Sequence, residues 1–492
     1  MGSFKKNVMF QTGYQILATA LPLVTTPYVS RVFGADGLGE YSYALNISSY
    51  FMTFAMLGFN NYGSKSIASC GHDKIRMEKT YSGIRKLQIC TSLMAMVVYI
   101  LGVCLLCDSS NRLMFLIQSL WIVDCFINVN WFFWGIEEVK LTVTRNFLIK
   151  IITLIGIFVF VKNKNDLLLY AVIMVIGTVL SDFYLIVLAR RYVRNVEVDI
   201  KEVQSHLSPC LWLFVPIVAI TLYQQIDKTM LGILSTYDQV GYYYNADKVV
   251  NIPLGIIAGF GTVSLPRIVS LIATKKYDEY KKLVAKSISL IMFLCSAIVF
   301  GIITIVKHFV PLFFGTGFDD CIILISVLSF TIYFKSISTV IVNQVLIPND
   351  NEKQYVASVF GGAFINTIVN YFLILRYGAL GAVTATLLSE LIVCLLQILM
   401  CKKNISISKL LLHNIYYVFA GIIMCATTKL IVQKITINSM IVLTAVDIVI
   451  GAAIYCGLCM VYWAISKDQL FFSLIRNALK KLFAWRSIVS KR

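Results

Sequence analysis

The chain has 492 residues, of which 58% are hydrophobic and only 14% are charged. Soluble domains are about a quarter charged, so this composition, with a mean hydropathy of +0.79, excludes a soluble globular protein and indicates many membrane spans with short connections. The formal net charge of +18 is typical either of nucleic-acid binding or of basic cytosolic connections, and its distribution along the chain separates the two.

Hydropathy predicts fourteen spans of about 20 residues each. They cover 8–30, 38–62, 87–107, 113–135, 141–161, 167–189, 207–234, 240–264, 287–306, 321–347, 355–375, 379–401, 411–432 and 440–464. With the N-terminus in the cytosol, 30 of the 43 Lys and Arg residues face the cytosol, seven face outward and six lie within spans. This asymmetry follows the positive-inside rule. It predicts a multi-pass protein with both termini cytoplasmic and no nucleic-acid partner.

The first span and the turn after it contain an unusual stretch, LPLVTTPYVSRVFGADGLGEYSY (21–43). Each of its two prolines removes a backbone hydrogen bond and bends or loosens a helix. Gly34, Gly37 and Gly39 are expected to form the turn into the second span, with Arg31 at the outer end of the first. The prolines fit either a static packing kink or a moving element at an interface between lobes.

Similar segments recur about 200 residues apart. GFNNYGSKSIAS (58–69) resembles GFGTVSLPRIVS (259–270), and GLGEYSY (37–43) resembles QVGYYYN (239–245). Because six spans separate the copies, they share one orientation, as in a parallel repeat. The sequence therefore predicts an all-α membrane protein with two six-helix lobes around a central cavity, the layout of an alternating-access transporter. The expected divisions are an N-lobe (1–206), a C-lobe (207–401), two further spans (402–464) and a basic cytoplasmic tail (465–492).

The run TTPYVSRVFGADGLGEYSYALNISSYFMTFAMLGFNNYGSKSIAS resembles the N-terminal signature of bacterial polysaccharide repeat-unit flippases. These form the O-antigen, capsule and exopolysaccharide branch of the multidrug/oligosaccharidyl-lipid/polysaccharide exporter superfamily. The run LGAVTATLLSE (380–390) extends the resemblance toward residue 400. The resemblance implies a V-shaped pair of lobes in the bacterial cytoplasmic (inner) membrane. It implies transfer of undecaprenyl-diphosphate-linked oligosaccharide from the inner to the outer leaflet.

The same resemblance implies a transporter without catalytic residues, metal or cofactor. Its expected partners are the lipid-linked oligosaccharide, membrane lipids and a polysaccharide polymerase and chain-length complex. The lipid II flippase, a more distant relative, uses arginines in its first two spans. This chain has only Arg31 there, so the cationic role is expected to fall to spans five, seven, eight or ten.

Such a cargo requires particular side chains. A diphosphate needs cations in a wet cavity, and sugars need amides, hydroxyls and aromatic rings. A charge at the bilayer centre costs about 2.5–3.5 kcal/mol, so each charge in a span requires a partner or a function. The substrate-binding candidates are Arg31, Asn46, Asn60, Asn61, Arg145, Lys150, Gln224, Lys228, Lys248, Asn251 and Lys335.

Simpler interpretations remain open for several of these residues. Arg145 could snorkel to the interface, and Asp227, Lys228, Asp247 and Lys248 could form structural salt bridges between consecutive antiparallel helices. Carboxylates within spans are candidates for ion coupling, and the sequence does not choose among them. They are Asp124, Asp182, Asp227, Asp247 and Glu390.

Two other functions compete with the flippase. A multidrug exporter of the same superfamily is a cation antiporter, and the six bases and six acids within the spans do not exclude it; the N-terminal signature disfavours it. A membrane polysaccharide polymerase or glycosyltransferase requires a large loop or a metal-binding acidic pair. The four histidines are isolated and no HExxH or DxD motif occurs, which disfavours an enzyme.

Overall fold

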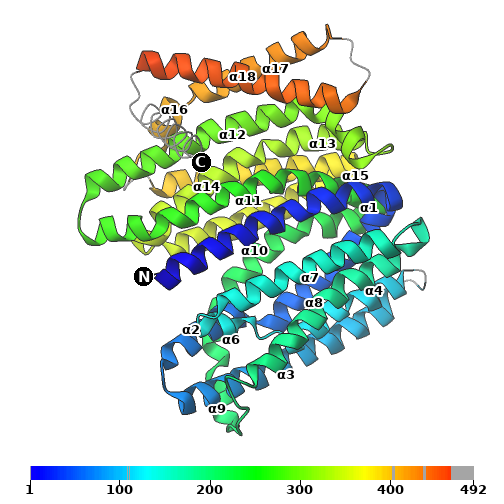
Figure 1. Ribbon diagram of the computed structural model, residues 1–492, viewed down its shortest axis with the longest axis vertical. Helices are drawn as coiled ribbons and strands as arrows, with labels where there is room; N and C mark the ends of the chain where they lie inside the picture. Colours follow the sequence, from blue (N-terminus) through cyan, green and yellow to red (C-terminus); the bar gives the residue numbers. More distant parts are fainter. Residues whose placement is uncertain (1, 108, 110, 402–404, 436–438, 467–492) are drawn as a thin grey trace, which may run out of the picture. The chain divides into compact units, whose positions relative to one another are not determined.

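The computed structural model describes residues 2–107, 109, 111–401, 405–435 and 439–466, with the side chains of 2–20, 139, 256 and 258–264 excepted. Every regular element in this part of the chain is a helix (Figure 1). Helices satisfy all their backbone hydrogen bonds internally, as the hydrocarbon core of a membrane requires. The predicted basic tail lies, from residue 467 on, outside the described residues.

The helices follow one another with short connections. In the first half they are α1 (Gly2–Met56), α2 (Phe59–Cys70), α3 (Lys74–Leu106), α4 (Arg112–Gln118), α5 (Leu120–Ile127), α6 (Asn130–Gly135), α7 (Val139–Phe160), the 3-10 turn η1 (Lys164–Asp166), α8 (Leu167–Ala189), α9 (Ile200–Ser205) and α10 (Leu207–Leu234). In the second half they are α11 (Tyr237–Ala273), α12 (Tyr277–Phe314), α13 (Asp320–Ser329), α14 (Thr331–Ile341), the π-helical turn η2 (Val342–Leu346), the 3-10 turn η3 (Ile347–Asn349), α15 (Glu352–Met400), α16 (Ile407–His413), α17 (Tyr416–Val432) and α18 (Met440–Ser466).

All fourteen predicted spans fall on these helices. Among the described residues, nine helical segments are long and apolar enough to cross a membrane, and the bent pair α16 and α17 makes a tenth. One of these segments, α15, holds two predicted spans on either side of a break at Gly378. Helix α1 holds the first two predicted spans on either side of Gly34, and α11 holds the eighth. The prediction of a polytopic helical membrane protein with about fourteen spans is confirmed.

The turn between the first two spans lies at Gly34, which has a φ of 69°. Glycine reaches this left-handed region without the steric penalty of a side chain. Pro22 and Pro27 lie inside the first part of α1, and the Arg31 guanidinium donates to the Pro27 carbonyl at 3.0 Å. The helix therefore runs through both prolines and breaks at the glycine.

The chain forms two compact units. Unit 1 comprises residues 1–259, 313–328 and 353–393, and unit 2 comprises the remainder. In unit 1, α1 packs against α3, α7 and α10, and α5 packs against α8. Large aromatic side chains fill its interior, among them Tyr41, Tyr99, Trp131 and Phe132.

Unit 2 contains the last two predicted spans. Helices α17 and α18 pack side by side, and aromatic rings join them to α12. Trp463 donates its indole N–H to the Tyr417 hydroxyl at 3.0 Å, and Tyr455 donates to the Phe293 carbonyl at 2.8 Å.

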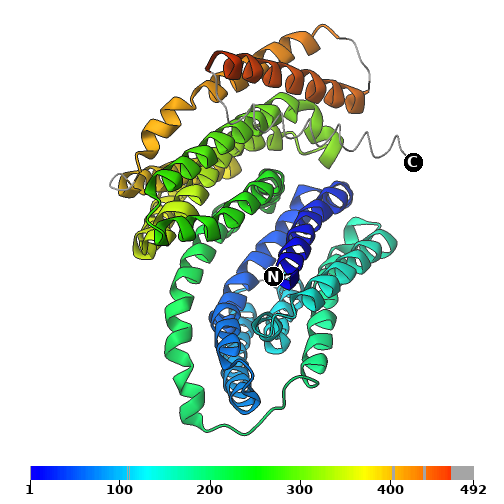
Figure 2. The same ribbon diagram turned by 60° about the vertical axis from the view of Figure 1, so that its left-hand side comes forward.

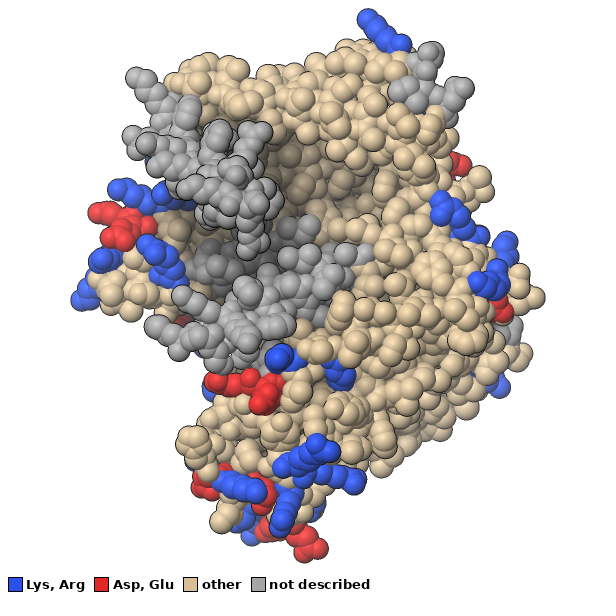
Figure 3. All heavy atoms as spheres, in the orientation of Figure 1, with Lys and Arg blue, Asp and Glu red and all other residues tan. Residues whose placement is uncertain are grey.

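The outward faces of the long helices are apolar. On α3, for example, Leu93 and Val97 are about half exposed. Such side chains belong against lipid, because burial within the protein does not account for them. On the face drawn in Figure 3 most atoms are uncharged, and Lys and Arg gather near helix ends, including the end of unit 1 where α3 begins and α9 lies.

Two glycines mark the closest approach of α1 and α11 within unit 1. A Cβ added at Gly39 would lie 1.8 Å from the Tyr237 carbonyl oxygen, and one added at Gly241 would lie 1.9 Å from the Ala35 carbonyl oxygen. Gly39 and Gly241 are equivalent positions in the predicted repeat, and so are Ala35 and Tyr237. The two copies of the predicted repeat would therefore meet in a locally symmetric contact that only glycine permits.

Candidate functional site

A partly buried ion pair joins α10 to α11. The Lys228 ammonium lies 3.0 Å from Asp247 Oδ2, with 14% of the lysine side chain and 21% of the aspartate side chain exposed. Asn251 donates its side-chain amide to Asp247 Oδ1 at 2.7 Å. The predicted interhelical salt bridge thus connects Lys228 with Asp247.

A second lysine lies beside this pair. The Lys248 ammonium lies 3.9 Å from the centre of the Tyr244 ring, and the Lys228 ammonium lies 5.9 Å from the same ring. Both geometries fit cation–π attraction. Two lysines and one aspartate give this group a formal charge of +1, which suits a phosphate better than a cation.

Asp227 lies in a second, buried polar network and not in the Lys228–Asp247 pair. It accepts hydrogen bonds from the Tyr243 hydroxyl at 2.6 Å, from Asn370 Nδ2 at 2.6 Å and from the Thr386 hydroxyl at 2.9 Å. Asp227 is 3% exposed. Its three donors come from α11 and α15 and are neutral, so this carboxylate is hydrogen-bonded by polar groups from two other helices.

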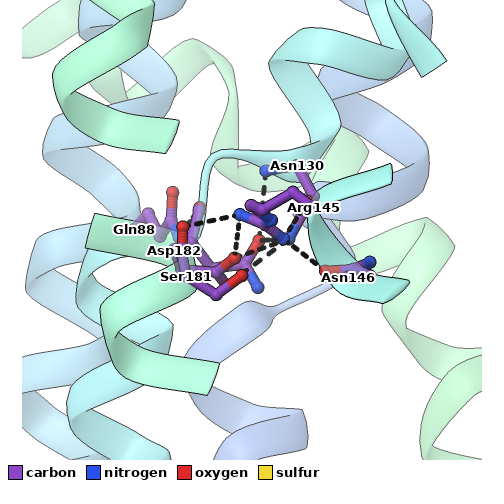
Figure 4. A network of polar contacts seen from close by, with 7 residues as sticks. Gln88, Asn130, Arg145, Asn146, Ser181 and Asp182 are labelled. Atoms are coloured by element: carbon purple, nitrogen blue, oxygen red, sulfur yellow. Dashed lines mark hydrogen bonds and ion pairs between the residues drawn. The ribbon is translucent and has the colours of Figure 1, made fainter. Parts of the chain in front are cut away.

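A further carboxylate network lies in the N-terminal half of unit 1 (Figure 4). Arg145 on α7 contacts Asp182 Oδ1 on α8 at 2.7 Å and donates to the Ser181 carbonyl at 2.9 Å. Its other terminal nitrogen donates to the Asn130 and Asn146 side chains at 3.3 and 2.7 Å. Arg145 is 9% exposed, so it forms a buried ion pair and does not snorkel to the interface.

Asp124 on α5 lies next to this ion pair as a neighbour of Asp182. Asp124 is 5% exposed, and its Oδ1 has no hydrogen-bond partner among the described residues. Among the described residues, Arg145 thus pairs with Asp182, and Asp124 beside it has no cation at ion-pair distance. This imbalance makes the network able to accept one more positive charge, because an isolated buried carboxylate is strongly disfavoured.

The Asn46 amide, predicted in the second span, and the Tyr50 hydroxyl one turn further on face α10. Asn46 donates to the Thr229 hydroxyl at 2.6 Å and to the Gln225 carbonyl at 3.1 Å, and the Tyr50 hydroxyl lies 2.9 Å from that of Thr229. Asn46 is 3% exposed. In this conformation these groups join the two copies of the repeat.

The other candidates occupy separate positions. Asn60 is partly buried, and its Oδ1 has no hydrogen-bond partner within the described chain. Lys150 on α7, Lys335 on α14 in unit 2 and Glu390 on α15 are half-buried or buried. The remaining candidates are exposed: Arg31, Asn61 and Gln224.

Some residues of these networks were not predicted. Asn370 and Thr386 reach Asp227 from about 140 to 160 residues further along the chain, and Asn130 reaches Arg145 from α6. A usable signal was present, because Asn366 and Asn370 lie four residues apart in a predicted span and hydrogen-bond at 2.9 Å. Polar i, i+4 pairs in a membrane helix lie on one face and indicate a polar neighbour.

Comparison with known proteins identifies the family. The family model described as "Polysaccharide biosynthesis protein" matches residues 4–272. The chain belongs to this family. A second model, "Lipid II flippase MurJ", matches residues 146–451. The chain is also 22% identical over 406 residues to "Putative O-antigen transporter" of Escherichia coli (strain K12), covering 82% of this chain and 97% of that relative.

Solved structures share the fold of this member of the polysaccharide biosynthesis protein family. "Lipid II flippase MurJ, inward closed conformation" aligns with a TM-score of 0.73 at 15% identity, over 94% of this chain and 99% of that one. An inward-facing multidrug resistance MATE family transporter aligns with a TM-score of 0.62 at 13% identity, over 79% and 95%. The expected resemblance to polysaccharide repeat-unit flippases is confirmed, and the protein is a transporter of this superfamily rather than an enzyme.

Proposed function

We propose that the protein is a flippase that moves an undecaprenyl-diphosphate-linked oligosaccharide from the inner to the outer leaflet of the cytoplasmic membrane, for assembly of a surface polysaccharide. The observation that carries the proposal is the family match over residues 4–272 together with the O-antigen transporter as a full-length relative. A polysaccharide polymerase and chain-length complex would receive the product. Both chain termini lie in the cytosol, as the distribution of basic residues indicates.

In this proposal the cationic group on α10 and α11 binds the diphosphate. Lys228 and Lys248 face one ring, that of Tyr244, and Lys228 pairs with Asp247. An incoming phosphate competes with Asp247 for the Lys228 ammonium and also meets the nearby Lys248 ammonium, because charge-assisted hydrogen bonds form best to the more strongly charged oxygen. Asp247 then holds Lys228 in place while the site is empty, so that this partly buried cation has a partner.

The sugars would contact amides, hydroxyls and rings near this group. Asn46 and Asn251 lie on the helices that carry or contact the two lysines, and Asn60, Asn61 and Gln224 extend the polar surface. Arg31, Arg145, Lys150 and Lys335 remain predicted contacts. Of these, the buried Arg145 already holds Asp182 in an ion pair, so its role in the proposal is structural support for an ion site.

Two buried carboxylate networks are the candidates for energy coupling. Asp182 pairs with Arg145 beside Asp124, and Asp227 is surrounded by neutral donors. Uptake of a proton or a small cation would reduce the negative charge of either network. That change would shift the equilibrium between two conformations of the lobes. Asp247 and Glu390 remain the other candidates. Domain boundaries near residues 206 and 401 are part of the same proposal of two lobes.

A multidrug cation antiporter is the alternative, and the fold does not separate it, because MATE transporters share the fold. The charge of the group formed by Lys228, Lys248 and Asp247, called the Lys228 group, does separate the flippase from the antiporter. A site with two lysines and one carboxylate favours an anionic cargo and repels organic cations.

The test uses a bacterial strain that lacks this protein but retains its glycan pathway, with the position of the diphosphate-linked repeat unit measured by an impermeant probe. We expect the repeat unit to remain in the inner leaflet and wild-type protein to restore its transfer. Lys228→Met should reduce transfer at least tenfold. The double variant Lys228→Met/Asp247→Leu removes the pair without leaving an unpaired charge, so it should fold as wild type does and still fail to transport.

The double variant distinguishes a purely structural ion pair from one that binds the diphosphate. Full transfer by the double variant would mean that the ion pair is structural and that the diphosphate binds elsewhere. Lys429→Met, which removes an exposed cation from α17, is the matched control and should transport normally. Normal transfer in the strain without the protein, when no other flippase is present, would overturn the flippase and favour drug export.

A further inference from the structure

A basic cavity of about 520 Å³ lies in unit 1 beside the first half of α3 and the end of α8. Four basic side chains line it, Arg85, Lys86, Arg190 and Arg194, and none of its lining residues is acidic. The third predicted span begins directly after Lys86, and the sixth ends directly before Arg190. The cavity therefore lies where both helices cross the predicted membrane boundary, on the side with the basic connections.

Specific contacts build the wall of this cavity. The backbone N–H of Val196 donates to the Ser82 hydroxyl oxygen at 2.9 Å, and the Lys86 ammonium donates to the Val198 carbonyl at 3.2 Å. These contacts fix the connection after α8 against α3. Figure 2 shows that connection as extended chain crossing the end of the unit toward α9.

The least exposed of these cations, Arg85, has no carboxylate partner in the part of the chain that the structure describes. Arg85 is 8% exposed, and both of its hydrogen bonds leave from Nη1, to the Phe126 carbonyl at 2.7 Å and to Gln88 Oε1 at 3.3 Å. Within the described chain no carboxylate lies at ion-pair distance from Arg85. The nearby Glu78 accepts from the backbone N–H of Arg194 at 3.4 Å. An uncompensated buried cation is unfavourable, so an anion in the cavity would stabilise this end of the unit.

One wall of the cavity is apolar and continues onto the lipid-facing surface. Ile89 and Ile186 line the cavity, and Ile89 is 43% exposed. Leu93, four residues further along α3, is 55% exposed, and Phe183, three residues earlier on α8, is 57% exposed. Residues at these spacings lie on the same helix face, so an apolar strip leads from the cavity toward the hydrocarbon.

We propose that this cavity binds the phosphate of an anionic phospholipid, with the acyl chains lying along the apolar strip. Basic pockets between membrane helices at the cytosolic boundary recognise such headgroups. A soluble anion would satisfy the cations but would leave the strip unused. The site is separate from the Lys228 group on α10 and α11, and its binding can be measured without any transport assay.

The test titrates lipids into the purified protein in a neutral detergent and follows its melting temperature, which rises with the concentration of a ligand that binds the folded state. Phosphatidylglycerol should raise the melting temperature, and phosphatidylcholine and inorganic phosphate should not. Arg190→Gln/Arg194→Gln changes two exposed cations. It should weaken the apparent affinity for phosphatidylglycerol about fivefold for each cation removed.

Lys201→Gln is the matched control, because it removes an exposed cation from α9, in the same connection, that does not line the cavity. It should respond to phosphatidylglycerol as wild type does. An equal response of the double variant and wild type would overturn the site. An equal response to inorganic phosphate, or stabilisation only by a polyprenyl phosphate, would overturn the phospholipid as its occupant.

Discussion

At the scale of single residues, the buried charges of the N-terminal half depend on one another. Arg145 is almost fully buried, and its hydrogen bonds reach α6, α7 and α8. Asp182 receives in addition the amide of Asn130 at 3.3 Å. Removing one member of a buried ion pair leaves the other without compensation, which is more harmful than removing both.

The first prediction follows from that asymmetry. Arg145→Met should destabilise the protein by about 3–5 kcal/mol, because it leaves Asp124 and Asp182 buried without a cation. Arg145→Met/Asp182→Asn should recover most of that loss. The melting temperature of the purified protein in one detergent measures both effects. A melting temperature of Arg145→Met equal to that of wild type would show that the pair does not stabilise the fold. Lys429→Met controls for the loss of a cation from a span.

At the scale of helices, the backbones of α1 and α11 are in direct contact where the two helices cross. Gly39 faces the Tyr237 carbonyl and Gly241 faces the Ala35 carbonyl, each closer than any Cβ tolerates. Small residues allow such close approach in membrane helices, where dispersion and weak polar contacts hold helices together. The crossing joins the predicted start of span two to that of span eight.

Either Gly39→Ala or Gly241→Ala should separate the two helices, because the added methyl group would meet a carbonyl oxygen below 2 Å. We expect a loss of about 1–3 kcal/mol of stability, typical of overpacking, and reduced transport. Melting of the purified variants and the transfer assay measure the two effects. Gly102→Ala on α3 is the control, since no heavy atom lies within 4 Å of its added Cβ. Wild-type behaviour of both variants would mean that the helices part at little cost.

The helices themselves were predictable, because long apolar runs and short basic connections leave few alternatives. The place of the break in α1 was less so. The sequence offered two prolines and three glycines, and the backbone turns at Gly34, where φ is positive. The prolines stay helical, and at Pro27 the carbonyl accepts a hydrogen bond from the Arg31 side chain. The prolines leave the carbonyls four residues earlier without their usual N–H donors, and membrane helices tolerate such freed groups without a break.

The candidate site was only partly predictable. Charges in spans are rare, so Lys228, Lys248 and Asp247 stood out from sequence alone. Which of them pair depends on how two helices are rotated. Asp227, adjacent to Lys228, faces Asn370 and Thr386 and not a lysine. Those partners come from a helix over 140 residues away, and the Asn366/Asn370 spacing marks a polar face on that helix without saying which carboxylate it meets.

At the scale of the whole molecule, transport by alternating access requires contacts that form in one state and break in another. The hydrogen bond from Asn46 on α1 to Thr229 on α10, at 2.6 Å, links the two copies of the repeat. Tyr50 adds a second link to the same threonine at 2.9 Å. If the lobes move apart in the transport cycle, these two helices are expected to separate there.

A covalent link at that contact should therefore stop the cycle. In Asn46→Cys/Thr229→Cys the two thiols replace side chains already in contact, so a short bis-methanethiosulfonate crosslinker should join them through two disulfide bonds, which a reductant cleaves. The crosslinked protein should lose transfer of the repeat unit, and cleavage of the link by reductant should restore it. Each single-cysteine variant, treated identically, controls for reaction with native thiols such as the exposed Cys90, Cys104 and Cys456. Full transport by the crosslinked protein would show that α1 and α10 stay together throughout the cycle, and the moving contact would then have to lie elsewhere in the chain.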